Sequence, residues 1–213
     1  MEVTILALGG GIYCLQSIHG EMESNTFDYQ RITRLTPLNL VLGKLFGAPS
    51  LAYFVVLCLI PGTLVAASFA HLSISALIWI YVILFLGALT LHALALSMSA
   101  LVGRSSSVGA IILFLLLVYI LAFLEGNGGS TLGLQSISPY FVNQIMIMDG
   151  IGLSNFRPDY ALPAGKDFLF GQAVPHTFVL VVLYLTLTAW FLFGLVRNVK
   201  RDPQQVWNRI ARW

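Results

Sequence analysis

The sequence predicts an all-α membrane protein with about five transmembrane helices, a cytoplasmic amphipathic helix and an outer re-entrant or interfacial helix. Of its 213 residues, 58% are hydrophobic and only 9% are charged, whereas a soluble domain carries about 25% charged residues. Several apolar stretches approach or exceed the roughly 20 residues that a helix needs to cross the hydrocarbon. The few charges gather in connecting segments, so the main solvent of this chain is expected to be lipid.

The apolar stretches define five spans in one transmembrane domain, residues 1–213. These spans lie at about residues 3–18, 48–70, 75–102, 108–124 and 175–196. The first is short and glycine-rich, and Glu2 is the only charged residue before it. A signal peptide begins with a positive region and ends at a small-residue cleavage site, so we interpret this stretch as a short or incomplete membrane helix. Strands of a barrel would alternate in about ten-residue units, which these runs do not.

The distribution of basic residues predicts the orientation. If the polar segment 19–47 faces the cytoplasm, the turn at Arg104 and the tail 197–213 do so too. Nine of the eleven Lys and Arg residues then lie on the cytoplasmic side, as the positive-inside rule requires. The other two lie in the outer loop 125–174. The expected protein is a multi-pass protein of the cell membrane, of the bacterial plasma or inner membrane type, with its C-terminus in the cytoplasm.

The polar segment between the first two spans is predicted to form a surface helix followed by an elbow. Ser24 or Asn25 can cap this helix. Thr36 ends it, because the residue before Pro37 is pushed out of the helical region. Asn39 can then cap the next helix, which enters the membrane. The surface helix also has one apolar side, because apolar residues recur in it at three-residue spacing.

Two further elements are expected at the membrane surfaces. In the outer loop, Ser138 caps and Pro139 opens a helix through Met148, which is too short to span. In the tail, Trp207 and Arg209 belong to an amphipathic pattern that can anchor to membrane lipids. A topology signal without an anchoring role is the alternative for the tail.

Some residues within the spans are candidate functional positions. Pro61-Gly62 removes a backbone donor in mid-membrane and predicts a kink, with a hinge as the functional interpretation. Small or polar residues follow one face of the third span: Ala88, His92, Ala95, Ser99 and Gly103. Such a face favours close helix packing. His92 is either a substrate or proton contact or a neutral histidine bonded across a helix pair, and Glu125 either gates or reaches interfacial water.

The sequence lacks the motifs of common enzyme classes. Neither Gly43-Lys44 nor Gly165-Lys166 is followed by the Ser or Thr of a phosphate-binding loop. No zinc-protease or hydrolase motif occurs, and the four histidines lie in separate segments without metal spacing. No basic groove with aromatic residues indicates a nucleic-acid partner. We therefore expect a non-catalytic chain without a cofactor; an intramembrane enzyme is disfavoured because His92 and Glu125 lack acid-base partners in sequence.

The polar segment resembles the signature of a known family. The residues that carry the resemblance are Glu21-x-Glu-x-x-Thr26-x-Asp28, Arg34-Leu-Thr-Pro-Leu38 and Val41-Leu-Gly-Lys-Leu45-x-Gly47. This pattern is similar to that of ABC-2 type transporter permeases, in which an acidic-Thr-acidic segment and a TPL turn precede a Gly-Lys motif where the chain enters the next span. The similarity is most specific over about residues 19–62. The later spans agree in number, polarity and a large outer loop.

The resemblance implies a membrane subunit of an ATP-binding cassette transporter, which exports a substrate with ATP hydrolysed by a separate ATPase subunit. It also implies a second permease subunit, as a homo- or heterodimer. The surface helix would be a coupling helix that docks on the ATPase. Carried onto this sequence, the candidate contacts are Glu21, Glu23, Thr26, Asp28, Arg31, Arg34 and Pro37. Gly43 and Lys44 match the motif at the next span, where Lys44 is alternatively a side chain that snorkels to lipid phosphates.

The chain departs from the family pattern at its start. Family members usually have six spans with a sizeable outer segment after the first, whereas this sequence begins just before the part that matches the second. The chain is then either a shortened member or one that starts at an internal methionine. A missing span would leave part of the dimer or substrate surface unformed. The alternative function is therefore a membrane-anchoring or assembly protein without transport activity of its own.

Overall fold

The computed structural model of the chain describes residues 5–24, 36–72, 74–102, 166–169 and 172–200, together with Glu2 and Thr26. This part of the chain is helical apart from one hairpin. The elements in chain order are the π-helix η1 (Ile5–Gly9), α2 (Gly10–Glu23), α4 (Pro37–Gly47), α5 (Ser50–Phe69), α6 (Ile74–Val102), β1 (Lys166–Leu169), β2 (Gln172–Pro175) and α9 (His176–Lys200).

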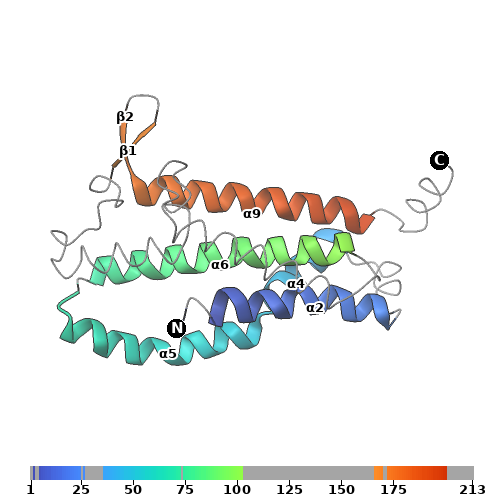
Figure 1. Ribbon diagram of the computed structural model, residues 1–213, viewed down its shortest axis with the longest axis horizontal. Coiled ribbons are helices and arrows are strands. Elements are labelled where there is room, and N and C mark those ends of the chain that lie inside the picture. Colours follow the sequence, from blue (N-terminus) through green and yellow to red (C-terminus); the bar gives the residue numbers. More distant parts are fainter. Residues whose placement is uncertain are drawn as a thin grey trace, which may run out of the picture.

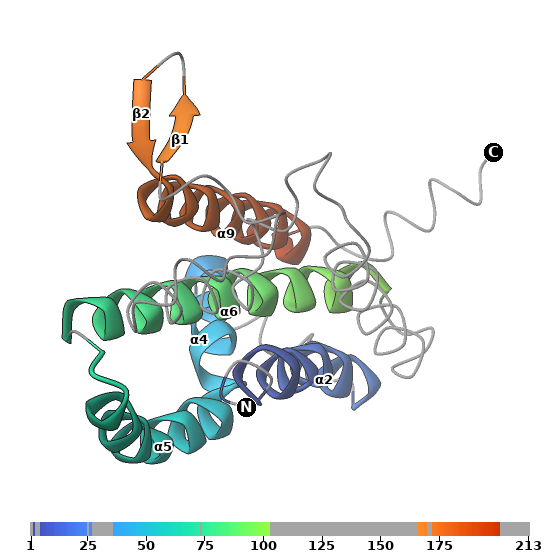
Figure 2. The ribbon, with the colours of Figure 1, turned by 60° about the vertical axis from the view of Figure 1, so that its left-hand side comes forward.

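The long helix α6 is the centre of the arrangement. It lies between α2 and α9, while α5 lies on the α2 side (Figure 1). The short helix α4 runs across the direction of α6 and reaches both α2 and α9 (Figure 2). The largest buried cluster forms where α2, α4, α6 and α9 meet. It contains Cys14, Leu15, Ile18, Val41, Leu45, Ala93, Ala95, Leu96 and Leu195.

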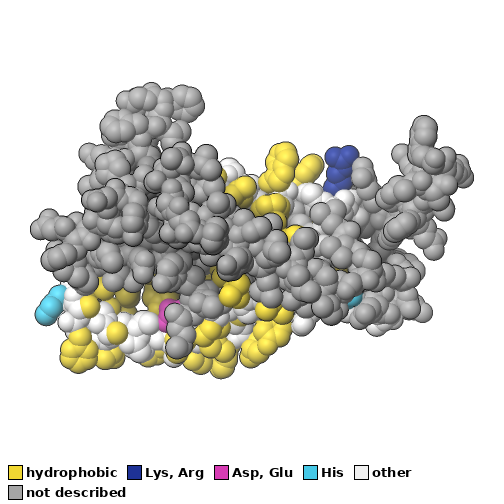
Figure 3. Space-filling model, viewed as in Figure 1, with side chains coloured by type: hydrophobic (Ala, Val, Ile, Leu, Met, Phe, Trp, Pro, Cys, Tyr) yellow, Lys and Arg dark blue, Asp and Glu magenta, His cyan; other side chains and the backbone are white. Residues whose placement is uncertain are grey.

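Three of the described helices are long and apolar enough to cross a membrane: Ser50–Phe69, Ile74–Ala100 and Phe178–Asn198. They lie close to three of the spans expected from the sequence. Large hydrophobic side chains remain exposed on α5 and α9, among them Phe54, Leu57, Trp190 and Phe193. Figure 3 shows such side chains gathered along the edge that α5 forms. Faces of this kind suit a lipid environment. The expected span 108–124 lies outside the described residues.

The first helical segment is longer than the sequence suggested. η1 continues directly into α2, which ends at Glu23 rather than near residue 18. The hydroxyl of Ser24 donates to the carbonyl of Gly20 at 2.8 Å. The side chain of Ser24 therefore satisfies the C-terminal turn of α2. The greater part of the expected surface helix, residues 27–35, lies outside the described part of the chain.

The break at Thr36-Pro37 lies where the sequence predicted it, but Thr36 rather than Asn39 caps the next helix. Thr36 has extended backbone angles, and its hydroxyl accepts a hydrogen bond from the Asn39 amide at 3.3 Å. Pro37 follows as the first helical residue, where its missing N–H costs nothing and its fixed φ suits a helix start. The same dipeptide that was predicted to end one helix thus starts α4. Asn39 donates its backbone amide to this cap rather than forming a cap itself.

The described part of the chain is helical as expected, and one short hairpin is added to it. β1 and β2 pair antiparallel, with Lys166 opposite Pro175 and Leu169 opposite Gln172. Two residues separate the strands, which is the commonest length of a hairpin connection. The hairpin occupies the end of the expected outer loop 125–174 together with Pro175, and it leads directly into α9 (Figure 1). The rest of that loop, including the helix expected at 138–148, lies outside the described residues.

Candidate functional site

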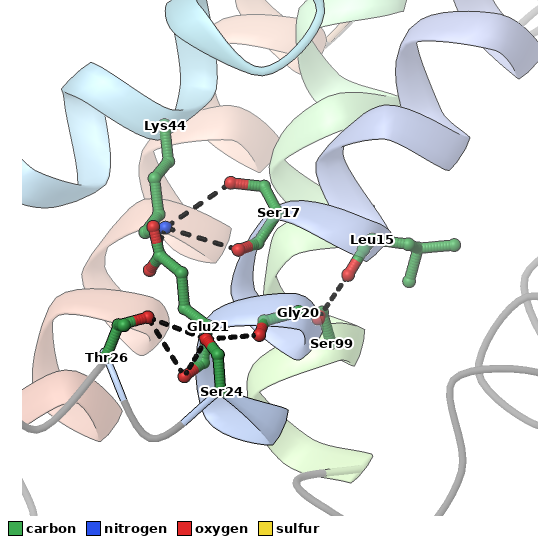
Figure 4. Close-up of polar contacts among 8 residues, drawn as sticks. All are labelled: Leu15, Ser17, Gly20, Glu21, Ser24, Thr26, Lys44 and Ser99. Carbon is green, nitrogen blue, oxygen red and sulfur yellow. Dashed lines mark hydrogen bonds and ion pairs between the residues drawn. The ribbon is translucent and has the colours of Figure 1, made fainter.

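Lys44 points inward from α4 to the end of α2. Its ammonium group donates to the hydroxyl of Ser17 at 3.3 Å and to the carbonyl of Ser17 at 3.4 Å. It also forms an ion pair with the carboxylate of Glu21 (Figure 4). Ser17 and Glu21 are one helical turn apart on α2, so one face of α2 provides all three acceptors. Lys44 is thus held within the protein and does not extend to lipid phosphates.

The hydrogen-bond donors and acceptors of this contact match in number, and its two charges are opposite. The side chains of Lys44 and Glu21 are 9% and 27% exposed. A buried ammonium group is unfavourable by several kcal/mol unless it is paired and hydrogen-bonded. An ammonium has three N–H donors, and the two oxygens of Ser17 and the carboxylate of Glu21 provide three acceptors. The contact therefore depends on both charged partners being present.

The predicted docking residues have different surroundings, and some of them lie outside the described part of the chain. Glu21 faces Lys44, and Thr26 is exposed, with its hydroxyl 2.8 Å from that of Ser24 (Figure 4). Pro37 opens α4, and the backbone of Glu23 ends α2. Three further candidates lie outside the described residues: Asp28, Arg31 and Arg34.

Gly43 and Lys44 face different surroundings although they share a motif. A Cβ atom added at Gly43 would meet nothing within 4 Å, and Gly43 is exposed. Its side therefore leaves room for a larger residue or a partner. Lys44, the next residue, lies on the buried side of α4. The structure thus brings Lys44 together with Glu21, two residues to which the sequence had assigned separate roles.

A second polar contact lies deeper, at His92 of α6. Its Nε2 atom is 2.8 Å from the carbonyl oxygen of Leu6, and its Nδ1 atom is 3.0 Å from the hydroxyl of Tyr53. A carbonyl can only accept, so Nε2 carries a proton, and in the neutral form that burial favours Nδ1 accepts from Tyr53. The fully buried ring is therefore a neutral imidazole that joins η1, α5 and α6.

Gly10 makes room for this imidazole. A Cβ atom at position 10 would lie 2.2 Å from Nε2 of His92 and 3.1 Å from the Cβ of Pro49. Both distances are shorter than ordinary carbon contacts, so only glycine fits. The neighbouring Gly9 has nothing within 4 Å of the same virtual atom. Packing therefore requires glycine at position 10 but not at position 9.

The predicted small-residue face of α6 is the face that packs against the first helical segment. Its four described members, Ala88, His92, Ala95 and Ser99, are all buried. Ser99 donates its hydroxyl to the carbonyl of Leu15 at 2.6 Å. The small side chains let α2 approach α6 closely. The hydrogen bonds of His92 to Leu6 and of Ser99 to Leu15 hold the first helical segment in position. The other two candidates, Gly103 and Glu125, lie outside the described residues.

The interface between α6 and α9 contains polar residues that the sequence analysis did not single out. The hydroxyl of Thr90 lies 3.0 Å from that of Thr188 and 3.3 Å from the carbonyl of Tyr184. Ser97 donates to the carbonyl of Phe191 at 3.3 Å. Thr90 and Ser97 are seven residues apart on one face of α6. That spacing was the available signal, because small polar residues commonly bond across helices in lipid.

A hydrogen bond next to Pro61 and Gly62 joins α5 to α6. Pro61 lies inside α5, which curves along its length (Figure 1). A Cβ at Gly62 would meet nothing within 4 Å. Thr63 bonds to the carbonyl of Ile60 at 2.9 Å and to the hydroxyl of Tyr81 on α6. Thr63 thus links α5 to α6 two residues after the proline.

Among the described residues, no three His, Cys, Asp or Glu side chains are placed to hold a metal ion. The polar groups instead form contacts between helices: Lys44 with α2, His92 with η1 and α5, and Thr90 with α9. Comparison of the chain with protein-family models, curated proteins and solved structures found no match.

Proposed function

We propose that this chain is the membrane-spanning permease subunit of an ABC-2 type ATP-binding cassette transporter. The observation that carries the proposal is the polar segment from Glu21 to Gly47, with its acidic-Thr-acidic, Thr-Pro-Leu and Gly-Lys patterns. Apolar helices precede and follow it. Such a segment is suited to the contact between a membrane protein and a soluble one.

The energy for transport comes, in this proposal, from a separate ATPase subunit. The sequence has no phosphate-binding loop, so the chain needs a partner that binds ATP. The acidic and basic residues of the polar segment supply complementary charges for such a partner, which favours specific and rapid association. Docking on the cytoplasmic side agrees with the distribution of Lys and Arg.

The proposed assembly contains two permease subunits and two ATPase subunits in the bacterial plasma or inner membrane. Export is the proposed direction, as the resemblance implies. The C-terminus lies in the cytoplasm, and the hairpin before α9 lies outside. The exposed apolar faces of α5 and α9 contact lipid or the second permease subunit.

Co-purification tests the proposal directly. A tagged chain is extracted from its native membranes in mild detergent, and ATP-binding subunits that remain bound are identified by mass spectrometry. Reversal of charge at Glu23 and Asp28 should reduce the retained ATPase about tenfold or more, by analogy with charged interface residues. Asp167 of the outer hairpin provides a matched control, and Asp167→Lys should retain the ATPase at the wild-type level.

Two results would count against the proposal. Wild-type protein that retains no ATPase would exclude it, and binding indifferent to the reversals at Glu23 and Asp28 would exclude this docking surface. Retention of other membrane proteins without an ATPase would instead favour the anchoring or assembly function.

A further inference from the structure

The contact between Lys44 and Glu21 closes the polar segment into a loop. The two residues are 23 positions apart: Glu21 lies at the end of α2, where the segment begins, and Lys44 lies in α4, where the segment ends. We propose that Glu21 and Lys44 are positioning residues that tie the polar segment to the first helical segment of the bundle. A movement of the polar segment then moves α2. This inference rests on the proposed function, in which the ATPase subunit causes that movement.

The contact between Lys44 and Glu21 is suited to hold α4 in position against α2. The three acceptors of α2 match the three donors of the Lys44 ammonium, and Lys44 is largely buried. Removing the charge of Glu21 would take the carboxylate away from the largely buried ammonium of Lys44, which is strongly unfavourable. Val41 and Leu45 on the same side of α4 are buried in the cluster shared with α2 and α6. The ion pair therefore reinforces an apolar contact between the same helices.

From α2 the linkage continues into α6. Leu15, two residues before Ser17, accepts the hydrogen bond of Ser99 (Figure 4). Leu6, at the other end of the first helical segment, accepts the hydrogen bond of His92. One helical segment is thus joined to the polar segment by Lys44 and to the central helix at two positions. This geometry connects the polar segment to a helix long enough to cross the membrane.

This role differs from that of a docking contact. A docking residue acts on the partner directly, so Glu21 would affect ATPase binding whether or not Lys44 is present. A positioning pair acts as a unit, so the loss of either residue has the same effect and the loss of both adds little. A double-mutant cycle that measures binding and ATP hydrolysis separately distinguishes the two roles.

The experiment uses Glu21→Gln, Lys44→Met and the double variant in the co-purified complex. Each variant should retain the ATPase within about twofold of wild type, while ATP hydrolysis by the complex falls at least about fivefold, and the double variant should fall no further than either single variant. Glu23→Gln is the contrasting control, because it should weaken retention of the ATPase. The amount of each variant in the membrane and its thermal denaturation in detergent serve as folding controls.

A charge exchange covers the case in which a single variant fails to fold. The double variant Glu21→Lys with Lys44→Glu keeps an ion pair and should recover folding and ATP hydrolysis relative to either single reversal. Loss of ATPase retention in Glu21→Gln but not in Lys44→Met would overturn the inference, because Glu21 would then contact the partner. Three further results would also overturn the inference. They are single-variant losses of ATP hydrolysis that multiply in the double variant, wild-type ATP hydrolysis in all variants, and a charge exchange that lowers ATP hydrolysis as much as the single reversals. A wild-type chain that retains no ATPase would instead contradict the proposed function.

Discussion

The Nε2 atom of His92 lies 2.8 Å from the carbonyl oxygen of Leu6, 86 positions earlier in the chain. The acceptor belongs to η1, a short π-helical turn of a type that often occurs at functional sites. The donor belongs to the middle of α6. With Tyr53 on the other ring nitrogen, one neutral side chain fixes three helical segments. The following predictions test this contact, the packing of α9 and the passage of the chain through the membrane.

Gly10→Ala should destabilise the protein by about 2 kcal/mol, as overpacked core positions do. The added methyl group would lie 2.2 Å from Nε2 of His92 and would displace the ring from Leu6. Gly9→Ala is the matched control, because its methyl group would meet nothing within 4 Å. Unfolding in detergent measures both. Equal stability of the two variants would contradict the close approach of His92 to Gly10.

Tyr53→Phe should lower stability by about 1 kcal/mol, within the range measured for hydrogen bonds inside membranes. The change removes the hydroxyl that donates to Nδ1 of His92 and leaves the apolar ring in place. Tyr13 is a matched control, because its side chain is 41% exposed, and Tyr13→Phe should leave the unfolding midpoint unchanged. A midpoint as high for Tyr53→Phe as for wild type would show that the hydroxyl contributes nothing.

Thr90→Val and Thr188→Val should each weaken the contact of α6 with α9, and the double variant should cost less than their sum. The two hydroxyls lie 3.0 Å apart, so either single change leaves a buried hydroxyl without this partner, whereas the double change removes both. The coupling energy should be about 0.6 kcal/mol, the average for such pairs in lipid. Thr186→Val is the control, because the exposed Thr186 hydroxyl donates within its own helix, to the carbonyl of Leu183. Strict additivity would contradict the bond between Thr90 and Thr188.

α5 and α6 should each cross the membrane, so that the two ends of each helix lie on opposite sides. Ser24 is exposed near the α4 end of the bundle, and Phe69 is 82% exposed at the far end of α5. In a background without Cys14 and Cys58, a membrane-impermeant maleimide should label Phe69→Cys in intact cells. It should label Ser24→Cys only after permeabilisation. Labelling of both positions in intact cells would show that α5 does not cross the membrane.

The apolar helices were predictable because continuous hydropathy has few alternatives in a chain so poor in charge. The observed bounds Ser50–Phe69 and Ile74–Val102 lie close to the expected 48–70 and 75–102. The polar start of α4 was only partly predictable. Thr36, Pro37 and Asn39 were all recognised as capping or terminating residues, but which one caps depends on backbone angles that the sequence does not specify.

The contacts between helices were less predictable for a physical reason. His92 bonds to a backbone carbonyl, which has no signature in the sequence, and Gly10 is one of three consecutive glycines. Lys44 and Glu21 are too far apart in the chain for a helical spacing rule to relate them. Thr90 and Ser97 are different, because their seven-residue spacing was visible. A pattern of small polar residues on α6 could therefore have indicated the face that packs on α9.

In the function proposed above, this chain works with a separate ATPase subunit. Native mass spectrometry of the tagged complex, released from native membranes in mild detergent, tests this assembly. We expect a particle that contains two permease subunits, of which at least one is this chain, and two copies of an ATPase subunit with a phosphate-binding loop. Particles that contain this chain without any ATP-binding subunit would contradict it.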